Sequence, residues 1–184
     1  MSAISRVIAG VSGSPRGLPA LRYAAALARG HDAAFIPLHA WVAPGGEVAE
    51  RRCPSGYLRR VWENDAWERL WGTVDTAFGC VPSDVATEPL VVCGEAGWVL
   101  VRVASRTGDV LVIGTGRRGA VSRLAGGKVS RYCLAHACCP VLAVPPSPLE
   151  LQAGHGLHGW AFRHRGLSPR ELTASASGNS ADPQ

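Results

Sequence analysis

The sequence predicts an α/β protein with a doubly wound, five-stranded parallel sheet and helices on both faces. Short runs of β-branched and aliphatic residues alternate with longer segments in which apolar residues recur at helical spacing. Such alternation favours parallel strands joined by right-handed crossovers. The chain has 184 residues, of which 47% are hydrophobic and 18% charged, which is enough apolar material for one sizeable core.

The N-terminal segment is predicted to form a strand, a turn and a helix. Residues 6–11 are a short, mainly aliphatic run and predict the first strand. In the turn that follows, Ser14 is placed to cap a helix and Pro15 to occupy its first position, although a second proline allows a later start near Leu18. Small and apolar residues then recur at helical spacing until Gly30, where the helix is expected to end.

A second strand and a long helix are predicted next. Residues 34–39 predict a strand, and Pro37 inside it predicts an edge position or a bulge, because proline donates no ladder hydrogen bond. Residues 58–78 predict an amphipathic helix, with Leu58 and Val61 on its packing face. Its tryptophans are expected to pack against the domain rather than to form a ligand cage: Trp62, Trp67 and Trp71.

The alternation continues up to a proline cluster. The remaining predicted elements are a strand over 85–92 interrupted at Pro89, a helix over 96–107, a fully buried strand over 110–113, a helix over 127–136 and a last strand over 141–144. We expect the domain to span residues 1–146. Residues 147–184 are expected to be a partly disordered C-terminal extension, because prolines and small polar residues replace the periodic pattern.

The composition indicates a cytoplasmic protein. The apolar runs are too short for a membrane span, and the N-terminus lacks the apolar stretch of a secretory signal. The six cysteines include no C-x-x-C pair and are expected to be reduced thiols. The adjacent Cys138 and Cys139 are expected to pack at a strand start, with oxidant sensing as the alternative. No metal site is expected, since His155, His158 and His164 have no nearby carboxylate or cysteine.

Basic residues concentrate in one interval before the last strand. The formal net charge is +5, and no acidic residue lies between Asp109 and Glu150. The cations of that interval are Arg117, Arg118, Arg123, Lys128 and Arg131. They form either a solvated basic surface or an anion site, because cations beside glycines and a helix start attract phosphate. Nucleic acid is the less favoured partner, because Tyr132 is the one aromatic residue there for stacking.

The glycine-rich segment after the fourth strand does not match two standard nucleotide fingerprints. Residues 114–119 spell G-T-G-R-R-G, but they follow the fourth strand instead of the first, and Cys139 stands where an acid for the ribose is required. A phosphate loop of the G-x-x-x-x-G-K-[ST] type also fails, since Val129 follows Lys128. The sequence therefore predicts neither a dinucleotide dehydrogenase nor a P-loop NTPase.

Several segments together resemble the universal stress protein family. In residues 113–144, I-G-T-G-R-R-G leads from a buried strand into a glycine-rich loop, G-K-V-S-R-Y opens a helix and C-P-V-L-A-V closes the sheet, as in the last third of that family. V-I-A-G-V-S-G-S-P at 7–15 resembles its first strand and turn, L-H-A at 38–40 the end of its second strand, and G-E-A at 94–96 the exit of its third. The resemblance covers about residues 4–145. It implies a Rossmann-like fold, a nucleotide site between the first and fourth strands, and a homodimer paired through Val141 to Val144.

Three positions depart from the ATP-binding pattern that the resemblance implies. Ser12 takes the position at which the family pattern has an aspartate after the first strand. Arg117 replaces the second glycine of the loop opening, and Lys128 replaces the Ser or Thr that follows the third glycine. ATP with magnesium, a different anion, and no small ligand at all therefore stay open. The nucleotide-binding residues that the resemblance implies are Val11, Ser12, Ala40, Ile113, Gly114, Arg117, Gly127, Lys128, Val129 and Ser130.

The expected function is that of a regulatory protein of the stress response that binds ATP or another anion with altered affinity. The alternative is a ligand-free homodimer that acts through protein contacts. Catalysis beyond slow ATP hydrolysis is not expected, because no nucleophile, base and orienting group can be assembled from the spacing. His31, His39 and His136 are expected to be structural or surface residues.

Overall fold

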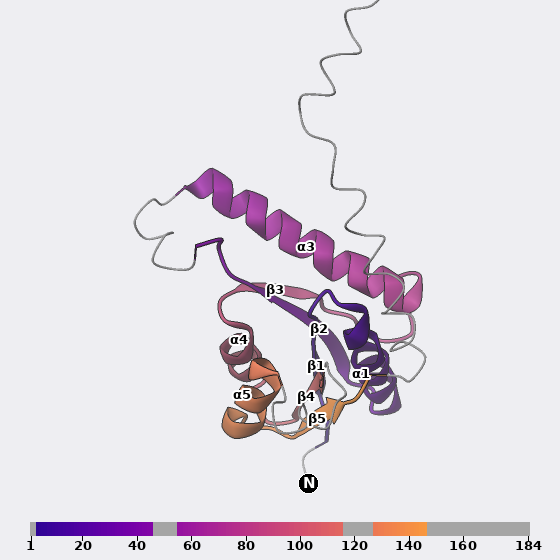
Figure 1. Ribbon diagram of the computed structural model, residues 1–184. Helices are drawn as coiled ribbons and strands as arrows, with labels where there is room; N and C mark the ends of the chain where they lie inside the picture. Colours follow the sequence, from indigo (N-terminus) through magenta and orange to yellow (C-terminus); the bar gives the residue numbers. More distant parts are fainter. Residues whose placement is uncertain (1–2, 46–54, 116–126, 147–184) are drawn as a thin grey trace, which may run out of the picture.

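The computed structural model describes residues 3–45, 55–115 and 127–146, which form a five-stranded parallel sheet with helices on both faces (Figure 1). The strands are β1 (Arg6–Gly10), β2 (Ala34–Trp41), β3 (Leu90–Cys93), β4 (Asp109–Gly114) and β5 (Val141–Val144). The helices are the 3-10 turn η1 (Pro15–Gly17), α1 (Leu18–Gly30), α3 (Gly56–Phe78), α4 (Ala96–Val103) and α5 (Lys128–His136). The strand order β3-β2-β1-β4-β5 is that of a doubly wound sheet, so the predicted fold class is confirmed. None of the helices in these ranges is long and apolar enough to cross a membrane.

Alternate residues of the central strands build a separate core on each face of the sheet. Val7 of β1 and Val112 of β4 belong to the core under α1 and α3, whereas Ile8 and Leu111 belong to the core under α4 and α5. All four side chains are withdrawn from solvent. β1 and β4 are therefore buried on both faces, which explains why their sequences are nearly continuous apolar runs.

A buried ion pair joins the amino ends of β1 and β4. The Asp109 carboxylate, which is fully buried, accepts hydrogen bonds from Nε of Arg6 at 2.8 Å and from its Nη2 at 2.6 Å. The backbone N–H of Arg106 donates a third bond at 2.8 Å. The hydrogen bond to this carboxylate raises the pKa of the Arg6 guanidinium, so the guanidinium stays charged and ties the two strands together.

The prediction that Pro37 marks an edge strand or a bulge is wrong. β2 lies inside the sheet and pairs with both β1 and β3. Alternate residues of a parallel strand bond to opposite neighbours, and Phe35 bonds to the segment that precedes β3, so Pro37 faces that segment too. The register from Phe35↔Thr87 into β3 places Pro37 opposite Pro89. Pro37 has no N–H for this ladder, whereas Pro89 is turned away from β2, because its neighbour Glu88 is the residue that bonds to Phe35. The predicted interruption at Pro89 is confirmed, since β3 begins only at Leu90.

The N-terminal half of α3 is largely exposed. Ser55 caps the helix, its Oγ accepting the backbone N–H of Leu58 at 3.3 Å. Leu70 and Val74 of the C-terminal half are buried, whereas Leu58 and Val61 are each 43% exposed, so the expectation that these two lie on the packing face is wrong. Figure 1 shows that the N-terminal part of α3 extends beyond the strands of the sheet. In this half of the helix, Trp62 and Ala66 pack against Trp41 and Ala43 at the end of β2.

The tryptophans of α3 divide between packing and exposure. Trp62 and Trp67 are partly buried against the core, as predicted. Trp71 remains 41% exposed and stacks on Trp67, with their ring centroids 6.2 Å apart. The stacked arrangement is that of a surface pair rather than of a cage around a ligand.

Candidate functional site

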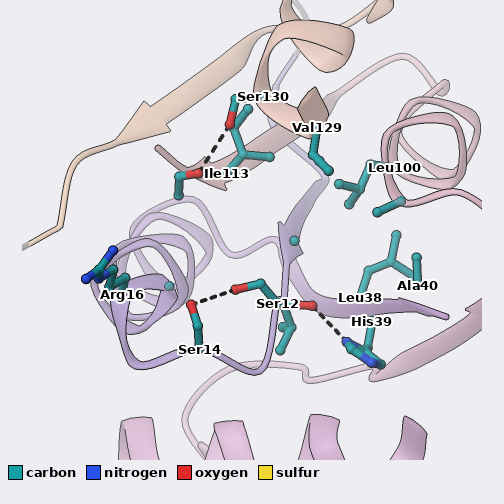
Figure 2. Close-up of a pocket in the computed structure, with 15 residues that line it drawn as sticks. Ser12, Ser14, Arg16, Leu38, His39, Ala40, Leu100, Ile113, Val129 and Ser130 are labelled. Carbon is teal, nitrogen blue, oxygen red and sulfur yellow. Dashed lines mark hydrogen bonds between the residues drawn. The ribbon is translucent and has the colours of Figure 1, made fainter. Parts of the chain in front are cut away.

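A cavity of about 320 Å³ lies at the carboxyl ends of β1 and β4. From β1 the chain continues to α1 on one face of the sheet, whereas the helix that follows β4, α5, lies on the other face. The crevice at such a reversal is the usual ligand position in open parallel sheets. Figure 2 shows the walls of the cavity, which are the turn after β1, the end of β2, α4 and the first turn of α5.

Most of the residues that the family resemblance implied line this cavity. They are Val11, Ser12, Ala40, Ile113, Gly114, Val129 and Ser130. Gly127 and Lys128, at the N-cap and the first position of α5, are exposed and are not among the lining residues. Arg117 lies outside the described residues.

Several lining residues were not predicted from the sequence. They are Gly10, Ser14, Arg16, Gly17, Leu38, His39, Ala96 and Leu100. Five of them lie three to eight positions beyond the end of a predicted strand, and no pattern in the sequence marked them as site residues. Gly10, Leu38 and His39 lie at such an end or one position before it. That position was the available signal, because ligand crevices gather the residues that flank the carboxyl ends of neighbouring strands.

The turn after β1 differs from its prediction and brings new groups to the cavity. Ser14 makes no capping hydrogen bond; its Oγ lies 3.1 Å from Oγ of Ser12 instead. The 3-10 turn η1 follows, and α1 starts at Leu18, the later of the two starts that the prolines allowed. The extra turn places Arg16 and Gly17 in the cavity wall. A β carbon added to Gly17 would lie 3.3 Å from Oγ of Ser12, so glycine keeps this approach open.

His39 has a structural role at the floor of the cavity. Its side chain is buried, and Nδ1 lies 2.8 Å from the carbonyl oxygen of Val11 (Figure 2). Because a carbonyl only accepts, Nδ1 carries the proton and donates. The bond holds the end of β2 against the residue that follows β1, and the expectation of a structural His39 is confirmed.

The first turn of α5 gives one end of the cavity a preference for anions. Gly127 supplies no side-chain cap, and among the described residues no other group caps this turn, whose backbone N–H groups can therefore meet an anion. Oγ of Ser130 donates to the carbonyl of Gly114 at 3.3 Å and holds α5 against the end of β4. Among the described residues that line the cavity, Arg16 adds a positive charge and none is a carboxylate.

The opposite end of the cavity is apolar. Leu38, Ala40 and Leu100 lie together on the side of β2 and α4 (Figure 2). Planar heterocycles bind well against such surfaces, because they remove apolar area from water while their polar edges reach backbone groups. One end of the cavity thus suits a base and the other an anionic group.

Two thiols near β5, the buried Cys133 and the half-buried Cys139, have raised pKa values. Burial, followed by the charge of Cys139, raises the pKa of Cys133 from 9.0 to about 11. Burial and the charge of Asp109 also raise the pKa of Cys139. Both are therefore protonated at neutral pH, whereas oxidant sensors need thiolates. Within the described ranges, no three His, Cys, Asp or Glu residues gather in a metal-binding group.

A comparison with protein-family models matches residues 3–145 to the universal stress protein family. The chain belongs to this family. A search of curated protein sequences finds no significant match.

Several solved structures share the fold of this universal stress protein. The hypothetical protein MJ0577 has a TM-score of 0.61 at 16% identity, with 79% of this chain and 99% of that chain covered. The universal stress protein UspA from Lactobacillus plantarum has a TM-score of 0.54 at 20% identity, covering 78% and 99%. The universal stress protein from Archaeoglobus fulgidus in complex with dAMP has a TM-score of 0.51 at 18% identity, covering 78% and 99%. At these identities the likeness concerns the fold.

Proposed function

We propose that this universal stress protein is a regulatory protein that binds an adenine nucleotide, or an anion of similar shape, between the ends of β1 and β4. The observation that carries the proposal is the cavity, with an apolar end beside β2 and α4 and the start of α5 at the other end. The dAMP complex of the Archaeoglobus fulgidus protein supports the choice of ligand.

The different chemistry of the two ends of the cavity sets the orientation of the bound nucleotide. The base packs against Leu38, Ala40 and Leu100, where apolar area is available. The phosphate meets the backbone N–H groups of residues 128–130, where the helix dipole favours negative charge. Lys128 is the first residue of α5 and adds a cation at the same end for the longer phosphate chain of ATP with magnesium.

Ser12 is expected to alter the affinity rather than abolish binding. Its hydroxyl and that of Ser14 remain at the turn after β1, where the family pattern has a carboxylate. A hydroxyl still bonds to a sugar, but a hydrogen bond to a neutral group is weaker than one to a charged group. No nucleophile and base are assigned to the site, and we propose that the protein acts by binding, in the cytoplasm, without catalysis.

Thermal unfolding with several anions tests this proposal. A ligand at about 100 times its Kd stabilises the native state by about 2.7 kcal/mol. For a domain of this size, that stabilisation raises the midpoint of thermal unfolding by about 8 °C. We expect millimolar AMP or Mg-ATP to raise the unfolding midpoint well beyond an equal concentration of sulfate. Equal shifts with all three would indicate a general anion site, and no shift with any of them would contradict ligand binding.

The open edge of β5 supports a second candidate function, a regulator that works as a homodimer with or without ligand. Within the ranges that the structure describes, β5 pairs with β4 alone. Thr115 donates to the carbonyl of Val144 and Leu111 to that of Pro140, so the backbone of Val141 and Ala143 faces away from β4 by the alternation of the ladder. The residues 141–144 proposed for the dimer thus have edge groups available for a second copy.

Replacing Ala143 with proline tests this dimer. The substitution removes an N–H that faces the open edge and leaves the bonds between β4 and β5 in place, and proline is tolerated on edge strands. We expect Ala143→Pro to shift the protein from dimer to monomer in light scattering at micromolar concentration, whereas Ala143→Thr remains dimeric. A monomeric wild type, or a dimeric proline variant, would contradict pairing through β5.

A further inference from the structure

Two more cavities border the proposed nucleotide site, and α3 forms a wall of both. One, of about 600 Å³, lies between the turn after β1 and α3, and shares Ser12 and Ser14 with the first cavity. The other, of about 340 Å³, lies between the end of β2 and α3, and shares His39 and Ala40 with the first cavity. Asp65 and Arg69 of α3 line both of these additional cavities.

The α3 wall presents hydrogen-bond acceptors to the larger of these cavities. Oγ1 of Thr73 donates to the carbonyl of Arg69 at 2.7 Å, and Oγ1 of Thr76 donates to the carbonyl of Gly72 at 2.6 Å. Both hydroxyl protons are therefore used within the helix, and only the lone pairs of the oxygens remain for a ligand. Asp65 adds a carboxylate to this wall.

One oxygen of the Asp65 carboxylate is paired with Arg69, and the other can accept a hydrogen bond from a ligand. Oδ2 of Asp65 lies 2.8 Å from Nη2 of Arg69, one helical turn along α3. Within the described part of the chain, its Oδ1 has no hydrogen-bond partner. The ion pair cancels the charge of Arg69, so the wall attracts groups that donate hydrogen bonds more than it attracts anions.

The opposite wall of the same cavity, the turn after β1, includes two hydroxyl groups. Ser12 and Ser14 face it as well as the proposed nucleotide site, and one of the two donates to the other. Figure 2 shows both side chains at the turn after β1, between the base end and η1. A ligand group at this boundary meets serine hydroxyls on one side and the acceptors of α3 on the other.

We propose that Asp65, oriented by Arg69, binds the vicinal hydroxyls of a ribose and makes the site selective for ribonucleotides. The inference rests on the proposed nucleotide binding and adds the sugar to it. A carboxylate that accepts from ribose hydroxyls is a common solution in nucleotide sites. The described residues that line the first cavity include no carboxylate, and Asp65 is the acid that lies beyond the serines. A phosphate does not fit this wall, because it carries no donors and would face a carboxylate.

The test compares two nucleotides and two variants by calorimetric titration of the full chain. AMP carries both hydroxyls, and 2′,3′-dideoxy-AMP carries neither. Asp65→Asn removes the charged acceptor, whereas Asp75→Asn makes the same change on α3 at a residue that lines neither cavity. Asp65 is exposed, so thermal midpoints of all three proteins should agree and exclude a folding defect.

We expect Asp65→Asn to weaken AMP binding about tenfold, the usual effect of losing a bond to a charged acceptor, and to leave the affinity for 2′,3′-dideoxy-AMP unchanged. Asp75→Asn should alter neither affinity. Equal affinities of the wild type for both nucleotides, or an equal loss for both in Asp65→Asn, would overturn the ribose assignment while nucleotide binding stands. No binding of either nucleotide by the wild type would overturn the proposed function, and this inference with it.

Discussion

A carboxylate introduced at the start of α5 should weaken nucleotide binding without weakening the fold. Val129 is the second residue of α5, lines the cavity and is 36% exposed. Val129→Asp adds a negative charge near the proposed phosphate position, and Val129→Asn has nearly the same shape without the charge. The two variants differ only in electrostatics, so their comparison separates charge repulsion from loss of packing.

The expected difference follows from Coulomb's law. At a separation of roughly 7 Å and an effective dielectric constant of about 20, two unit charges repel by about 2 kcal/mol, which corresponds to about thirtyfold in affinity. The same carboxylate interacts favourably with the helix dipole by about 0.3–1 kcal/mol. We therefore expect Val129→Asp to bind AMP about thirtyfold more weakly than Val129→Asn and to unfold at an equal or higher temperature.

Calorimetric titration at low and high salt measures both expectations. At 0.5 M NaCl the screening length falls to about 4 Å, so the difference between the two variants should shrink. The placement of the phosphate at α5 is refuted if the two variants bind AMP equally at low salt. A difference that is independent of salt would also contradict it, because it would point to a steric cause.

Two further predictions concern the fold. Arg6→Met should lower the free energy of unfolding by about 3–5 kcal/mol, because it leaves the buried Asp109 carboxylate without its cation. Chemical denaturation measures this loss, and the double variant Arg6→Met with Asp109→Leu should recover most of it. A loss below about 1 kcal/mol would show that the pair is not buried in solution. The pKa of Cys133 is raised to about 11 by burial, and a pKa above that of the unfolded chain contributes stability only while the group is protonated. The free energy of unfolding of the wild type should therefore fall relative to that of Cys133→Ala as the pH rises from 9.0 to about 11, and parallel curves for the two proteins would contradict the burial of this thiol.

The central strands were predictable because their environment is uniform. Val110 to Ile113 is apolar at every position, and a strand covered on both faces needs such a run. Glycines and prolines marked the ends of most elements for local steric reasons that operate in any fold. Seven of the ten site residues that the family resemblance implied lie on the cavity wall, five of them at the ends of strands and two in the first turn of α5.

The errors arose where a local rule depended on a distant partner. Pro37 is accepted inside the sheet because its missing N–H falls on the side of the segment before β3, where the ladder is interrupted, while its pairing with β1 stays in register. Leu58 and Val61 have the helical spacing of a packing face, yet the described sheet does not extend beneath them. Ser14 has the sequence position of a cap, but the hydroxyl of Ser12 is its partner.

The sequence by itself determined the order and type of the elements, and through them the doubly wound sheet with a crevice between β1 and β4. Local steric preferences and the periodicity of apolar residues suffice for that, because each acts over a few neighbouring positions. Only the tertiary structure decided which side chains meet at the crevice. Arg16 enters through a 3-10 turn, and Asp65 and Arg69 of α3 line the cavity that borders the crevice at Ser12 and Ser14. Contacts of this kind depend on the packing of whole elements against one another, and no local pattern encodes them.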